Sequence, residues 1–189
     1  MSNKQKHHQW KCGLAAAAVA LTGSLYGSLA SAGSESATPI YGVSAPVREQ
    51  LLQLSKAVQA FSSHDVARAA GWSATISDCI VSPAGGMGFH VANLDELEGR
   101  PFEVSLLRPE VLMYVPMEDG SMEFLGVEYI VPYTPENAST PPQLLGQSFQ
   151  YNPFLGIWAL HVWTERHNPL GVFASFNPSV SCEFAESGE

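Results

Sequence analysis

The sequence predicts an α+β fold in which N-terminal helices pack on a curved, mainly antiparallel, barrel-like sheet. Residues 47–61 have the apolar spacing of an amphipathic helix, whereas the chain after residue 72 consists of short β-branched and aromatic runs separated by Gly and Pro. No helical pattern long enough for repeated βαβ crossovers lies between these runs. The strands are therefore expected to pair antiparallel.

The first 32 residues have the parts of a secretory signal peptide. Three lysines form a positively charged start, residues 14–21 form a short apolar core, and Ala30-Ser31-Ala32 supplies a small-x-small cleavage pattern. The apolar core is shorter than the roughly 20 residues that span a bilayer. We therefore expect residues 1–32 to be removed on export, leaving a periplasmic or extracellular protein without a stable membrane anchor.

The exported part is expected to be one domain with an acidic surface. Residues 33–46 are rich in Ser, Gly and Pro and form a flexible lead-in, and residues 47–189 suffice for a single domain with a substantial core. The whole chain has 18 acidic and 9 basic residues. Since such a surface repels phosphates, nucleic acid is excluded as a partner, and a small molecule or metal ion is expected.

Two helices are predicted before the sheet. In residues 47–61, apolar side chains recur at three- and four-residue spacing and polar ones occupy the other face. Residues 62–72 fit a second, short helix that Ser62 or Ser63 caps at its start and Gly71 at its end.

The strands are predicted from short runs with alternating or continuous apolar character, and Asp119-Gly120 between two of them is a hairpin signal. The predicted strands are 74–81, 86–92, 110–116, 121–132, 145–150, 156–164 and 171–176.

Two cysteines, Cys79 and Cys182, remain after the predicted cleavage. An even pair without a CxxC motif, in an oxidising compartment, is typical of a structural disulfide. We therefore predict a bond between them.

Three predicted strands each carry one metal-ligand side chain among apolar neighbours: His90, Glu128 and His161. An ionised carboxylate in a dry interior costs several kcal/mol unless it is paired or bound to a cation, and a buried imidazole needs partners for both ring nitrogens. Two-residue alternation puts Glu128 on the face opposite Val127 and Tyr129. If the faces that carry the three residues line a curved sheet, they converge as a two-histidine, one-carboxylate group suited to Zn, Cu, Fe or Mn.

Two alternatives stay open for these residues. They could form a hydrogen-bonded network inside the core, or they could point to solvent from a one-sided sheet. No local motif such as HxxxH connects the two histidines.

Other charged residues are expected to have ordinary surface roles. Arg108 and Glu110 are predicted to form a surface ion pair. Asp95, Glu96 and Glu98 are expected in a solvated acidic loop, with oxygen ligation of calcium as the alternative.

Aromatic residues of the C-terminal third are expected to fill the core. Trp158, Trp163 and Phe173 are the residues that would line a site for a small apolar ligand, if the protein has one.

Motifs for nucleophilic hydrolysis and nucleotide binding are missing from the sequence, which has no GxSxG, Walker-type or GxGxxG pattern in the required context. No enzymatic activity is therefore assigned, and the catalytic residues are unknown.

Five segments between residues 79 and 182 together resemble a group of small exported bacterial proteins of uncharacterised function. The segments are AGGMGFH, RPEVLMYVP, LGVEYIVP, LHVWTERHNPLGVF and FNPSVSC. The resemblance implies secretion and a single domain, and it carries no activity, cofactor or catalytic residue with it.

Three functional hypotheses follow. The first is an exported protein that binds a divalent transition metal through His90, Glu128 and His161. The second is a non-enzymatic module that binds a small apolar ligand and uses the same residues as internal hydrogen-bond anchors. The third is a structural protein of the envelope.

Overall fold

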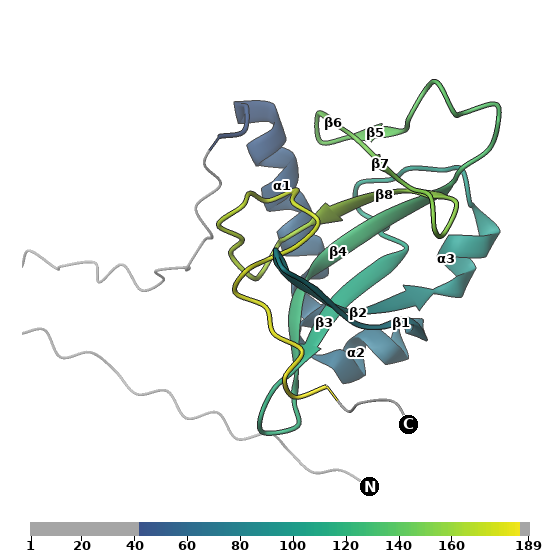
Figure 1. The fold of residues 1–189 in the computed structure, drawn as a ribbon. Helices are drawn as coiled ribbons and strands as arrows, with labels where there is room; N and C mark the ends of the chain where they lie inside the picture. Colours follow the sequence, from purple (N-terminus) through teal and green to yellow (C-terminus); the bar gives the residue numbers. More distant parts are fainter. Residues whose placement is uncertain (1–41, 186–189) are drawn as a thin grey trace, which may run out of the picture. The chain divides into compact units, whose positions relative to one another are not determined.

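The computed structural model describes residues 42–185, so the predicted signal peptide and most of the predicted lead-in lie outside the described residues. The described residues belong to one compact unit, Ser36–Glu189. An N-terminal helix packs on a six-stranded antiparallel sheet that curves into a half-barrel (Figure 1). The predicted α+β class and the antiparallel, curved sheet are confirmed.

The helices before the sheet form where the sequence predicts them. α1 spans Ala45–Val58 and continues into a 3₁₀ turn, η1, at Gln59–Ser62. α2 spans His64–Ala69, and the Ser63 hydroxyl at its N-cap accepts the N–H of Val66.

The main sheet has the order β1-β2-β3-β4-β8-β7, and every neighbouring pair is antiparallel. A separate two-stranded ladder joins β5 to β6, and the short helix α3, Leu94–Gly99, follows β2. The strands are β1 Trp72–Ser82, β2 Gly85–Asn93, β3 Val111–Pro116, β4 Met122–Pro132, β5 Gln143–Leu144, β6 Gln147–Ser148, β7 Gln150–Asn152 and β8 Ile157–Val162.

The predicted strand at 171–176 is wrong, because this segment is a series of turns. The Asn168 side chain accepts the N–H of Leu170 and donates to the carbonyl of Phe176, and Gly171 has φ 114°. These turn bonds satisfy backbone groups that a strand would have paired in a ladder.

The predicted acidic loop is also wrong, since residues 95–98 lie in α3. The side chain of Asn93 caps this helix by accepting the N–H groups of Asp95 and Glu96. The acidic side chains of the first turn then lie at the positive end of the helix, which they stabilise.

The two faces of the sheet bury different clusters. On one face, α1 contributes Leu51, Leu54 and Val58 to the largest cluster, which also holds Val127 and Tyr129 of β4. The opposite face holds two smaller clusters. β4 has a bulge at Leu125, because Met113 pairs with Gly126 whereas Tyr114 pairs with Phe124.

The C-terminal segment covers part of the second face. Val180 packs with Met113 and Trp163, and the predicted disulfide between Cys79 and Cys182 is confirmed, with 5.8 Å between the Cα atoms. Gly85 has φ 115°, and a Cβ there would lie 2.1 Å from the Asn177 carbonyl oxygen. Only glycine therefore permits this close approach of the segment to β2.

Candidate metal centre

His90, Glu128 and His161 come together on the face of the sheet that is opposite α1. Glu128 of β4 and His161 of β8 are directly paired across two neighbouring strands. β3 separates His90 from them, and there Met113 lies opposite His90 while Val111 lies opposite Glu128. Directly paired residues share a face, so the register alone places all three side chains on one side.

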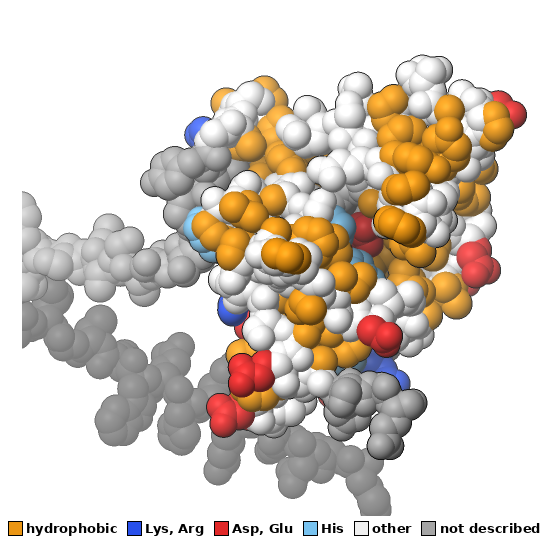
Figure 2. Space-filling model, viewed as in Figure 1, with side chains coloured by type: hydrophobic (Ala, Val, Ile, Leu, Met, Phe, Trp, Pro, Cys, Tyr) orange, Lys and Arg blue, Asp and Glu red, His pale blue; other side chains and the backbone are white. Residues whose placement is uncertain are grey.

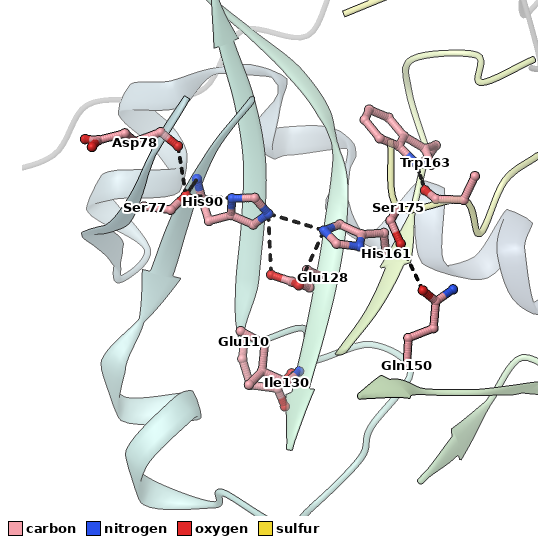
Figure 3. A network of polar contacts seen from close by, with 11 residues as sticks. Ser77, Asp78, His90, Glu110, Glu128, Ile130, Gln150, His161, Trp163 and Ser175 are labelled. Atoms are coloured by element: carbon pink, nitrogen blue, oxygen red, sulfur yellow. Dashed lines mark hydrogen bonds and ion pairs between the residues drawn. The ribbon is translucent and has the colours of Figure 1, made fainter. Parts of the chain in front are cut away.

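The polar atoms of the three side chains form a compact group, in which one ligand atom from each residue lies within 4.8 Å of the others (Figure 3). The two Nε2 atoms of His90 and His161 are 3.3 Å apart. Glu128 places Oε2 at 3.6 Å from Nε2 of His90 and Oε1 at 3.4 Å from Nε2 of His161. All three residues are buried, with 5–7% of their surface exposed.

These separations are close to those of a tetrahedral metal site. Ligand atoms at the 2.0–2.2 Å typical of zinc lie about 3.3–3.6 Å from one another around a tetrahedron. The three contacts of 3.3, 3.4 and 3.6 Å fall in that range, but those of Glu128 involve both of its oxygens. With one ligand atom from each residue, the separations are no more than 4.8 Å. The group is therefore able to hold a metal ion with only small movements of its side chains.

Ser77 of β1 contacts His90 through the ring nitrogen Nδ1. Its hydroxyl donates to the carbonyl of Asp78 at 3.0 Å and accepts the backbone N–H of His90 at 3.3 Å. Oγ also lies 2.7 Å from Nδ1 of His90, where donor and acceptor roles depend on the tautomer of the ring. The tautomer with its proton on Nδ1 leaves the lone pair of Nε2 directed at Glu128 and His161, as a metal ligand requires.

Burial shifts the protonation of the cluster toward neutral forms. Desolvation lowers the pKa of His90 to about 4, and desolvation together with the nearby His90 lowers the pKa of His161 to about 3. Desolvation, and then the charge of Glu110, raises the pKa of Glu128 to about 8. At neutral pH both imidazoles therefore offer lone pairs, and a cation would displace the proton of Glu128.

The predicted surface pair of Arg108 with Glu110 is wrong. Arg108 instead binds Glu96 at 2.9 Å, because α3 brings this carboxylate next to it. Glu110 is buried, and its Oε2 accepts the N–H of Ile130 at 3.2 Å. Burial is the main cause that raises the pKa of Glu110 to about 7. A second buried carboxyl group thus lies near the cluster, close enough to raise the pKa of Glu128.

The three aromatic residues named as ligand-lining candidates do not lie in one cluster. Trp158 and Phe173 pack with the cluster on the α1 face, and Trp163 packs on the opposite face. Protein atoms satisfy both indole N–H groups, since Trp158 donates to the Asn137 side chain and Trp163 to the carbonyl of Ala174.

Sequence reasoning missed Ser77 and the burial of Glu110. Ser77 contacts His90 only because β1 pairs with β2 in a register that contains several shifts. The run of apolar residues after Glu110 was the one available signal, because it marks the strand that follows as buried.

Comparison of the chain with protein-family models, with curated proteins and with solved structures finds no significant match.

Proposed function

We propose that the protein binds a divalent transition metal, zinc foremost, through Nε2 of His90, Nε2 of His161 and the carboxylate of Glu128. The observation that carries the proposal is the buried group of two imidazoles and one carboxylate, in which one ligand atom from each residue lies within 4.8 Å of the others. Copper, iron and manganese also accept this donor set, although their preferred geometries differ.

The surroundings support ligation. The Ser77 hydroxyl lies 2.7 Å from Nδ1 of His90 and is able to accept Nδ1–H when Nε2 binds a metal, which is the usual role of a hydrogen-bond partner of a ligating histidine. Three protein ligands leave a fourth position for water or a small molecule, as in catalytic zinc sites. This arrangement suits binding of a ligand or activation of water. The proposal itself concerns only the binding of the metal.

We place this protein outside the cytoplasm. The disulfide between Cys79 and Cys182 is typical of an oxidising compartment, and the resemblance to small exported bacterial proteins supports the same location. Within residues 42–185, no helix has the length and apolar character needed to cross a membrane.

A second candidate is a structural network without a metal. It is favoured by the His90–His161 contact, since 3.3 Å between two Nε2 atoms also fits a direct hydrogen bond when one ring carries its proton there. In that case the three residues would anchor the core, and the protein would serve as a binding module for an apolar ligand or as a structural protein.

Metal content decides between the two candidates. The tag-free exported protein is purified and analysed for metals beside two variants, His90→Ala/His161→Ala and Glu128→Gln. The matched control is His167→Ala, which removes an exposed imidazole outside the cluster. Circular dichroism confirms that each variant is folded.

We expect near-stoichiometric metal in the unmodified protein and in the control, and its loss in both cluster variants. Absence of metal from the unmodified protein, even after dialysis against zinc, copper, iron and manganese, would contradict the proposal and favour the network.

A further inference from the structure

The cluster is buried but reaches the surface at the bottom of a hollow. His90, Glu128 and His161 each keep 5–7% of their surface exposed. Figure 2 shows a hollow on one face in which acidic and histidine atoms are visible side by side, surrounded by hydrophobic side chains. A molecule that enters this hollow therefore meets polar ligand atoms at its floor and apolar atoms on its walls.

An apolar strip leads from the cluster along β8. Alternation places Ala159 and Ile157 on the same face as His161, and Ala159 lies directly opposite Ile130 of β4. Ile130 and Ile157 belong to one cluster, to which Leu97 of α3 also contributes. The strip is thus continuous from the cluster toward the turn between β7 and β8.

The β7–β8 turn presents large hydrophobic side chains to solvent at the end of this strip. Phe154 is 96% exposed and Leu155 is 69% exposed. In Figures 1 and 2, which share one view, this turn lies to the right of the hollow and hydrophobic side chains gather there. Exposed hydrophobic residues of this size, on the same side of the molecule as a hollow, are typical of ligand-binding surfaces.

The charge of the bound ion determines which chemical group of a ligand can bind at the bottom of the hollow. Two neutral imidazole ligands and one carboxylate ligand leave a divalent ion with a net charge of +1, which attracts an anionic donor to the fourth position, and the nearby carboxyl group of Glu110 reduces this attraction. Lys and Arg atoms visible in Figure 2 lie away from the hollow. The metal is thus the positive charge that an anion entering from this side would meet.

We infer that the ligand of this site is a small amphiphilic carboxylate, whose carboxylate binds the metal and whose aliphatic part lies on the strip toward Phe154 and Leu155. This inference rests on the proposed metal site. An uncharged apolar molecule lacks the donor for the metal, and a short carboxylate lacks the apolar part for the strip.

The test uses the full-length exported protein loaded with cobalt(II), whose visible spectrum reports a change of ligand at the metal. Three probes are titrated: acetate, octanoate and octanol. Burial of each additional methylene strengthens binding by about fourfold, so partial burial of the octanoate chain predicts at least tenfold tighter binding than acetate. Octanol is expected to leave the spectrum unchanged.

Two variants locate the apolar part. Phe154→Ser/Leu155→Ser changes only exposed side chains, so the fold and the cobalt content are expected to be unchanged. We expect it to reduce the advantage of octanoate over acetate by at least fivefold. The matched control is Leu52→Ser on α1, also an exposed large hydrophobic residue, which is expected to leave all three titrations unchanged.

Several results would overturn the inference while the metal site stands. They are equal binding of octanoate and acetate by the cobalt protein, or an octanoate advantage that the turn variant leaves intact. Loss of a dimer in the turn variant, without a change in octanoate binding, would assign the hydrophobic turn to contacts with a second copy. Failure to bind cobalt at all would overturn both this inference and the proposed metal site.

Discussion

The two faces of the sheet are built by the same strands but differ in what they bury. The face toward α1 is filled almost entirely by aliphatic and aromatic side chains, among them Leu54, Val127 and Tyr129. The opposite face buries two histidines and a glutamate beside smaller apolar clusters, and an irregular segment bound by a disulfide covers part of it. The comparison teaches that one face supplies hydrophobic stability, whereas the other buries polar groups at a cost in free energy and brings together three side chains that could hold a metal.

Removal of the disulfide is expected to have the largest effect on stability. The bond closes a loop of about one hundred residues, with a sequence separation of 103, and it ties the C-terminal segment to β1. In the chain-entropy model, Cys79→Ser/Cys182→Ser then lowers the free energy of unfolding by about 4–5 kcal/mol. Urea unfolding measures this change.

Reduction of the unmodified protein with a dithiol is the matching control, and it should produce the same loss, whereas the double variant should not respond to the dithiol. Equal stability of the reduced and oxidised protein would show that the C-terminal segment stays on the face of the sheet opposite α1 without the disulfide.

Truncation of the α1 face is expected to reduce stability without affecting the metal. Leu54 is fully buried in the largest cluster, so Leu54→Ala should lower the free energy of unfolding by about 2–5 kcal/mol. Leu52→Ala on the same helix, where half of the side chain is exposed, should change it by less than about 0.5 kcal/mol.

Metal content per folded molecule should be equal in both leucine variants. If Leu54→Ala alone loses the metal, the two faces are coupled and do not have separate roles.

Loss of the Ser77 hydroxyl is expected to weaken metal binding with little effect on stability. Ser77→Ala removes the acceptor for Nδ1–H of His90, and loss of such a partner typically reduces metal affinity about 10- to 100-fold. Ser77→Thr keeps the hydroxyl and should restore most of the affinity, as measured by competition with a chromophoric chelator. An equal decrease in both variants would indicate a packing effect in place of control of the tautomer.

The pH dependence of the metal-free protein is expected to give the smallest effect. Because the pKa of Glu128 rises to about 8 on folding, the folded state holds a proton that the unfolded state releases near its ordinary pKa of 4.5. This contribution to stability is complete below pH 4.5 and decreases as pH rises toward 8. Between pH 6.5 and 8, loss of the Glu128 proton should by itself lower stability by about 1–2 kcal/mol. The two histidines partly offset this decrease, because they are neutral in the folded state but still lose protons near pH 6.5 in the unfolded state.

Glu128→Gln provides the comparison, since the amide does not titrate and the variant should lose less stability over the same interval. Urea unfolding at several pH values, with chelator present, measures the difference. Metal affinity should change in the opposite direction and increase with pH, because the ion displaces the Glu128 proton. A pH profile that Glu128→Gln leaves unchanged would show that the carboxyl group does not bind its proton more tightly in the folded protein.

Much of the fold could be predicted because the signals are local. The apolar spacing of residues 47–61 predicted the helix that became α1 and η1, and the Asp119-Gly120 turn predicted the connection of β3 to β4. The prediction failed for residues 171–176, where apolar residues resemble a strand but Asn168 and Gly171 satisfy the backbone in turns. Local pattern also could not locate the bulge at Leu125, which puts Phe124 on the same face as Val127, whereas simple alternation would put these two residues on opposite faces.

By itself, the sequence determined the α+β class, the pairing of the two cysteines, and the side of its strand on which Glu128 lies relative to Val127 and Tyr129, because periodicity and residue type are properties of short segments. Only the tertiary structure decided that these side chains meet. His90 and His161 are 71 residues apart in the chain, and their contact depends on the strand order that places β8 beside β4. The same order buried Glu110 and directed Ser77 to His90, because strand pairing and register are set by the packing of the whole sheet.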